Sequence, residues 1–92
     1  MTQTKTYTEV SKDWSSLDQY LFVIDHCGQR GIITCEYQSC DEEGRTVNRD
    51  EADYFMVGFR RYFSAYIFGK QTTIMVKPDD VVTLKIDRRY GA

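Results

Sequence analysis

The sequence predicts an α+β fold: an antiparallel sheet of three to five strands with one long amphipathic helix packed on one face. The pattern also admits a second, short helix. Two observations support this prediction. Apolar residues recur at three- and four-residue spacing between residues 48 and 68, and at every second position in 72–77 and 81–87. Predicted helices and strands do not alternate strictly, which argues against a parallel sheet.

The long helix is predicted over residues 48–68. Asn48 is a suitable N-cap, and Glu51 stands three residues later, where a capping box places its second partner. Acidic residues crowd the first turn, where they suit the positive end of a helix dipole. Gly69 is a typical helix end. The apolar stripe of this helix comprises Ala52, Phe55, Met56, Phe59, Tyr62, Phe63, Tyr66 and Ile67.

The N-terminal part leaves more than one interpretation open. Residues 1–10 alternate threonine with other residues, which fits either a polar edge strand or a loose tail. Residues 14–27 have serine caps and apolar residues on one helical face. Residues 20–24 are also dense in strand-favouring types, and they are able to pair with 32–37 through a glycine-containing loop. Capping and periodicity together favour the helix slightly.

The remaining segments supply the predicted sheet. Residues 32–37 form a strand in this prediction, and the turn-rich, acidic residues 39–48 form an exposed loop. Residues 72–77 and 81–87 are predicted to pair as a hairpin, because Pro78–Asp80 between them is typical of a short turn. The apolar face of that hairpin would lie beneath the long helix.

Length and composition limit the class of protein. Ninety-two residues suffice for one domain, predicted to span residues 1–92. No run approaches the roughly 20 apolar residues of a membrane span. The first twelve residues contain no apolar core typical of a signal peptide. The sequence therefore predicts a soluble, cytoplasmic protein that binds no membrane.

Charge is distributed unevenly along the chain, although the net charge is only −2. Residues 36–53 contain seven acidic residues and two arginines. Residues 54–92 contain seven basic residues and three aspartates. This asymmetry predicts an acidic face and a basic face, each able to attract a partner of opposite charge. The alternative is an ordinary solvated surface whose charges contribute little.

The inventory of chemically active residues is small. His26, Cys27, Cys35 and Cys40 lie within fifteen residues of one another, but no C-x-x-C pair is present. We therefore expect free thiols and no bound metal. No nucleophile elbow, phosphate loop or dinucleotide-binding turn occurs. The sequence predicts a protein that is not an enzyme and that uses no cofactor or small-molecule ligand.

Two interaction hypotheses follow from the charge pattern. In the first, an acidic loop with a neighbouring Tyr/Arg pair docks on a basic protein surface. Its predicted partner-binding residues are Asp41, Glu42, Glu43, Asp50, Asp53, Tyr54 and Arg61. In the second, the basic C-terminal half contacts nucleic acid, using cations interleaved with tyrosines. Its predicted contacts are Lys85, Arg88 and Arg89, within a wider set of cations and tyrosines: Arg60, Arg61, Lys70, Lys77, Tyr54, Tyr62, Tyr66 and Tyr90.

The segment DEEGRTVNRDEADYF suits the presentation of acids to channels lined by lysine and arginine. Together with the short, acidic, tyrosine-rich chain, it resembles the small phage-encoded anti-CRISPR proteins that act on type I effector complexes. The resemblance is one of size and composition, since that family has no shared motif. It implies an inhibitor that binds CRISPR effector subunits carrying their guide RNA, blocks recognition of target DNA, and works in the host bacterial cytoplasm.

Overall fold

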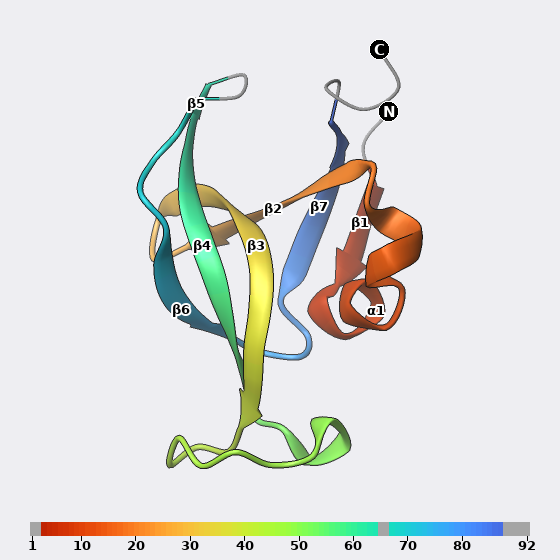
Figure 1. Cartoon of the computed structure of the whole chain (residues 1–92), viewed down its shortest axis with the longest axis vertical. Coiled ribbons are helices and arrows are strands. Elements are labelled where there is room, and N and C mark those ends of the chain that lie inside the picture. Colours follow the sequence, from red (N-terminus) through yellow and green to blue (C-terminus); the bar gives the residue numbers. More distant parts are fainter. Residues whose placement is uncertain (1–2, 65–66, 88–92) are drawn as a thin grey trace.

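An antiparallel sheet forms most of the computed structural model, which describes residues 3–64 and 67–87 (Figure 1). Within these described residues, seven strands are accompanied by three short helical segments, of which α1 is an α-helix and η1 and η2 are 3-10 helices. In chain order the elements are β1 (Gln3–Thr6), α1 (Tyr7–Lys12), η1 (Trp14–Leu17), β2 (Tyr20–His26), β3 (Gln29–Cys40), η2 (Arg49–Glu51), β4 (Tyr54–Ser64), β5 (Ile67–Phe68), β6 (Thr72–Val76) and β7 (Val81–Ile86).

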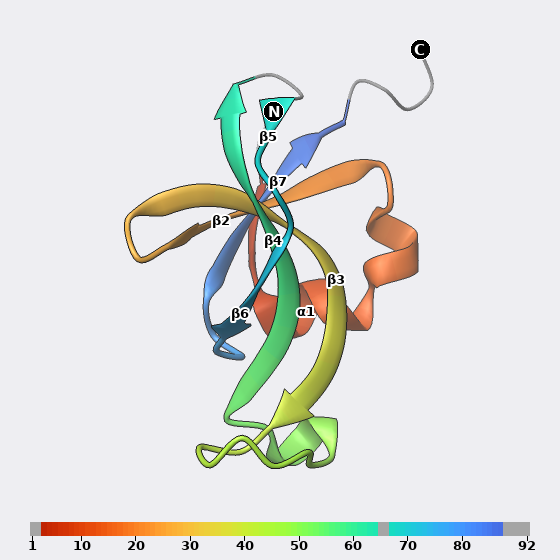
Figure 2. The same ribbon diagram turned by 60° about the vertical axis from the view of Figure 1, so that its left-hand side comes forward.

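The strands are ordered β1-β7-β2-β3-β4 across the sheet, and both β5 and β6 pair with β4. Residues 55–59 of β4 pair with β6, whereas Tyr62 and the end of β4 pair with β5. The last strand, β7, lies between β1 and β2 and pairs with both, so the two ends of the described chain meet in the sheet. In Figure 2, β2 and the first part of β3 reach out together on the left, whereas the rest of β3 runs down the right beside β4.

The long strand β3 belongs to both halves of this arrangement. Its first residues, 29–32, pair with β2, and residues 31–40 pair with β4. The register with β4 shifts twice, so that Thr34 and Tyr37 are extra residues on β3. Such bulges bend a strand and increase its twist. The bend lets one sheet curl around a core instead of remaining flat.

The main core fills the inside of the curl. Buried apolar side chains from α1 and from five strands meet there: Tyr7, Val10, Phe22, Ile24, Ile33, Phe55, Val57, Phe59, Val76, Val82 and Leu84. Phe59 lies directly against the backbone of β3, because a Cβ at Gly31 would be only 2.2 Å from its Cζ. Glycine at position 31 therefore makes room for a large aromatic ring in the core.

The helix α1 closes one side of the core. It begins with a capping box, in which the Thr6 and Glu9 side chains each bond the other residue's backbone N–H. The buried Tyr7 donates a hydrogen bond of 2.6 Å to Glu36 on β3. Burial, followed by this bond to Glu36, raises the Tyr7 pKa far above its usual value of 10. Arg49 bonds both Glu36 and Ser11, so it ties η2 to α1.

The predicted long helix over residues 48–68 is wrong. Within the described residues the longest helix is α1, with six residues, and none is long and apolar enough to cross a membrane. Phe55 and Phe59 lie four residues apart, a spacing that shares one face in a helix and also in a strand. Val57 between them is fully buried, which only the strand allows. The five aromatic residues of Tyr54–Ser64 favour a strand, and Gly58 disfavours a helix by about 1 kcal/mol.

The predicted capping box at Asn48 starts only the three residues of η2, and the Asn48 side chain makes no capping hydrogen bond.

The prediction of a helix over residues 14–27 is also wrong beyond its first turn. Residues 14–17 form η1, and Tyr20–His26 form β2, paired with β3 as in the alternative interpretation. The predicted hairpin of residues 72–77 and 81–87 does not form, because β6 pairs with β4 while β7 pairs with β1 and β2.

Replacing Phe59 by alanine should lower the free energy of unfolding by about 3–5 kcal/mol, because it empties the centre of the core beside Gly31. Phe63 provides a matched control: it is 55% exposed, although the helix prediction placed it on the same stripe. Phe63→Ala should cost less than about 1 kcal/mol. Denaturant unfolding of both variants measures the difference, and equal losses would contradict the strand assignment.

Candidate functional site

A second, smaller apolar cluster lies on the outer face of the sheet. On β2, Phe22 and Ile24 point into the main core, whereas Leu21 and Val23 join Ile32 in this second cluster. The alternation follows from the two-residue period of a strand. Two half-buried aromatic residues, Tyr62 of β4 and Phe68 of β5, pack against the cluster. The outer face therefore presents aromatic rings on a rigid, strand-built base.

Cations surround Tyr62. The Lys85 ammonium donates a hydrogen bond of 3.0 Å to the Tyr62 hydroxyl and lies 5.0 Å from the ring centroid. The Arg30 guanidinium lies 5.4 Å from the same centroid. Phe68 meets Tyr62 edge-on, with 5.5 Å between centroids. Both cation–π distances are within the range of attractive contacts.

Arg60 completes the arrangement on the neighbouring ring. Its guanidinium lies 5.5 Å from the Phe68 centroid, and its Nε donates a 2.7 Å hydrogen bond to the Gly69 carbonyl. This bond fixes the arginine where the chain leaves β5. We call the set of Arg30, Arg60, Tyr62, Phe68 and Lys85 the cationic aromatic face. Its residues come from β3, β4, β5 and β7, and pairing of the strands brings them together.

The cations of this face form no salt bridge among residues 3–64 and 67–87, although Asp25 is the register partner of Arg30. The ion pairs within that part of the chain lie elsewhere: Arg45 with Asp41 and Glu43, and Arg49 with Glu36. The positive charge of the face is therefore available to a ligand. The planar guanidinium group of an arginine is also a surface on which a nucleobase can stack.

The acidic loop is more structured than the sequence predicted. Asp41 accepts 2.9 Å hydrogen bonds from the backbone N–H groups of Arg45 and Glu43, and a 2.8 Å bond from Arg45 Nε. These contacts, the Arg45 backbone bond foremost, lower the Asp41 pKa. Arg45 also pairs with Glu43 at 2.9 Å. Glu42 is therefore the one of the three loop acids that Arg45 does not neutralise.

The other predicted partner-binding residues fall into two groups. Asp50 and Asp53 are exposed and lie with Glu42 at the loop end of the molecule. Tyr54 starts β4, opposite Cys40, and so lies beside this loop. Arg61 lies seven residues further along the same strand, about 23 Å away at the rise of an extended strand. The structure thus separates Arg61 from the acidic group.

The predicted nucleic-acid contacts are partly brought together. Lys85 belongs to the cationic aromatic face, with Arg60 and Tyr62 from the wider set. Arg88 and Arg89 lie outside the described residues. Arg30 was not among the predicted contacts. The alternative in which residues 20–24 form a strand pairs them with the start of β3, and a strand over residues 29–32 puts Arg30 on the same face as Ile32.

The cysteines and the histidine do not converge. Cys27 is exposed in the turn between β2 and β3, Cys35 is half-buried, and Cys40 is fully buried. His26 packs against the Phe59 ring, with 6.0 Å between centroids. Within the part of the chain that the structure describes, no three His, Cys, Asp or Glu side chains are grouped as metal ligands. The absence of a bound metal stays a prediction.

Comparison of this chain with protein-family models, with curated proteins and with solved structures found no significant match. The functional interpretation therefore depends on the geometry of the chain itself. Two features carry it: the cationic aromatic face on the outside of the sheet, and the exposed carboxylates of the loop between β3 and β4.

Asp41→Asn should lower the melting temperature at neutral pH, because the ionised carboxylate accepts three hydrogen bonds that fix the loop. The folded pKa of Asp41 lies below its ordinary value of 3.8. Ionised Asp41 therefore stabilises the fold above pH 3.8, and this contribution is lost as the pH falls through the lower folded pKa. Thermal melts from pH 7 to pH 2 should show the two proteins converging in acid. A constant difference would contradict the structural role of the charge.

Proposed function

We propose that the protein binds single-stranded nucleic acid, without catalysis, through the cationic aromatic face. The observation that carries this proposal is the contact of Tyr62 with two cations, Lys85 and Arg30, that form no salt bridge within the described residues. Proteins that bind single strands combine positive charge for the phosphates with planar groups on which bases stack. The face supplies both within one rigid surface.

Each residue type has a distinct role in this proposal. Lys85 and Arg60 neutralise phosphates, and Arg60 is already oriented by the Gly69 carbonyl. Arg30, supported from below by the Tyr62 ring, offers a planar surface to a base. Phe68 and Tyr62 keep the cations in place and are themselves half-buried. A single strand suits this face because its bases are unstacked and able to reach these groups.

The acidic loop does not cancel the charge of the face. The molecule is 41 Å long, and the loop and β5 lie at opposite ends of that axis (Figure 1). Exposed charges are screened over roughly 8 Å at physiological ionic strength. The carboxylates of the loop therefore have little effect on a nucleic acid bound at the face.

A second candidate function uses the opposite end of the chain. Glu42, Asp50 and Asp53 are exposed there, and Tyr54 lies beside them. This surface suits docking on a basic protein surface, the mode implied by the resemblance to the phage-encoded inhibitors of type I CRISPR effector complexes. In this candidate the carboxylates occupy the lysine- and arginine-lined channel that target DNA would enter, and the host bacterial cytoplasm is the place of action.

Lys85→Gln should weaken binding of a labelled octanucleotide, measured by fluorescence anisotropy across a salt series. One lost phosphate contact should reduce the slope of log affinity against log salt concentration by about 0.7. Lys12→Gln is the matched control, because Lys12 is an exposed lysine on α1, outside the face. Equal slopes for the two variants, or no salt-dependent binding by the unaltered protein, would refute the proposed function.

For the second candidate, Glu42→Lys with Asp53→Lys should slow association with a purified type I effector complex carrying its guide RNA. Surface binding kinetics at low and high salt measure the rate. Reversal of exposed steering charges acts mainly on the association rate and leaves the melting temperature nearly unchanged. Asp18→Lys with Asp79→Lys reverses two exposed acids outside the loop and serves as the control. If the two double variants associate at identical rates, the second candidate function is refuted.

A further inference from the structure

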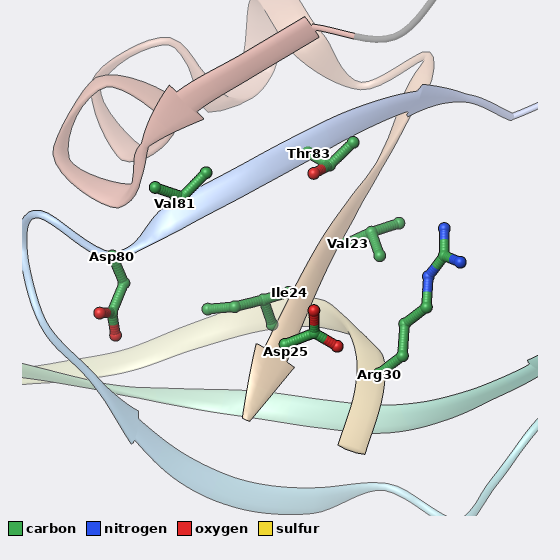
Figure 3. Close-up of a pocket in the computed structure, with 7 residues that line it drawn as sticks. All are labelled: Val23, Ile24, Asp25, Arg30, Asp80, Val81 and Thr83. Carbon is green, nitrogen blue, oxygen red and sulfur yellow. The ribbon is translucent and has the colours of Figure 1, made fainter. Parts of the chain in front are cut away.

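An open pocket of about 380 Å³ adjoins the cationic aromatic face (Figure 3). It lies where the end of β2, the start of β3 and the start of β7 approach one another. Its lining residues are Val23, Ile24, Asp25, Arg30, Asp80, Val81 and Thr83. Val23 belongs also to the outer apolar cluster, and Arg30 also covers the Tyr62 ring. Pocket and face are therefore one continuous surface.

The lining combines apolar walls with two hydrogen-bond acceptors. Val23 and Thr83 are register partners across β2 and β7, and Val81 is on the same side of β7 as Thr83. Asp25 and Arg30 are register partners across β2 and β3. In the view of Figure 3, Asp80 stands on one side of the pocket and Arg30 on the other, with Asp25 between them.

The carboxylates are placed to accept hydrogen bonds from a ligand. Asp80 Oδ2 accepts a 2.9 Å bond from the Lys77 backbone N–H, which orients the side chain. Within residues 3–64 and 67–87, no other donor reaches the Asp80 carboxylate and none reaches that of Asp25. An ionised carboxylate is an acceptor only, so these groups select ligands that present N–H donors.

We propose that this pocket receives one base of the bound single strand and prefers guanine. This inference rests on the proposed function and adds to it the base that the site selects. Guanine presents two adjacent donors, N1–H and the N2 amino group, which match the two oxygens of one carboxylate. Cytosine and adenine present one amino group each. Uracil and thymine flank their single N–H with two carbonyl oxygens, which a carboxylate repels.

The charge around the pocket distinguishes a base from other occupants. A lysine or arginine side chain of a protein partner would also satisfy Asp25 and Asp80. Such a cation would gain the attraction of the two carboxylates but would also be repelled by Arg30, which lines the pocket, and by Lys85 and Arg60 beyond it. A nucleotide instead places its phosphate toward these cations and its neutral base toward the carboxylates. The apolar walls from Val23 and Val81 then contact the faces of the base.

The test uses fluorescence anisotropy with two labelled RNA octamers, one of uridines only and one with a single central guanosine. The unaltered protein should bind the guanosine octamer about tenfold more tightly. Of Asp25→Asn and Asp80→Asn, the variant that alters the carboxylate paired with guanine should reduce this preference several-fold, while binding to the uridine octamer is retained. Asp79→Asn removes the same charge from the adjacent, exposed turn residue and should keep the full preference.

The outcomes separate the two proposals. Equal affinity for both octamers, or an undiminished preference in both aspartate variants, overturns the guanine pocket while the proposed function stands. Salt-independent or undetectable binding of both octamers overturns the proposed function and the pocket with it. Competition gives a second measurement: 5′-GMP should displace the guanosine octamer at lower concentration than 5′-UMP. Displacement by a short arginine peptide but not by 5′-GMP would assign the pocket to a protein partner instead.

Discussion

The bend of β3 is the constraint on which the rest of the structure depends. A straight strand of twelve residues would carry a flat sheet with two exposed apolar sides. Residues 29–32 of β3 pair with β2 and residues 31–40 pair with β4, and the extra residues Thr34 and Tyr37 bend the strand along its pairing with β4. The curl then places Phe59 against Gly31 and encloses the main core. The same curl turns Tyr62 outward, next to residues of β3 and β7.

The proposed function depends on the side chains that lie on the outer face of the curled sheet. Strands of a curled sheet have one buried face, and their remaining side chains meet on the outer surface even when they are distant in sequence. Arg30 and Lys85 are 55 positions apart in the chain, yet both contact the Tyr62 ring. Cations placed on aromatic rings lose fewer conformations on binding a ligand than free surface side chains do. The face is therefore prepared for a polyanion before any ligand arrives.

The loop between β3 and β4 shows how much of the charge pattern has a structural purpose. The sequence presented residues 41–43 as a run of exposed acids. In the structure Asp41 organises the loop by accepting three bonds, and Arg45 offsets part of the charge. Glu42, Asp50 and Asp53 are exposed, and their negative charges are not offset in this way. The two ends of the molecule consequently differ in sign, with most of the 41 Å axis between them.

Local patterns in the sequence determined the strands at residues 32–37, 72–76 and 81–86 and the turn at Pro78–Asp80, because these depend on alternation and turn chemistry within a few residues. The sequence also indicated the unequal charge of the two halves. Only the tertiary structure decided the state of residues 54–64, since Phe55 and Phe59 satisfy helix and strand periods equally. It likewise decided that β6 and β7 pair with other strands, and that Arg30 joins Lys85 at Tyr62. Such pairings depend on which distant strands lie side by side, and no local pattern encodes that choice.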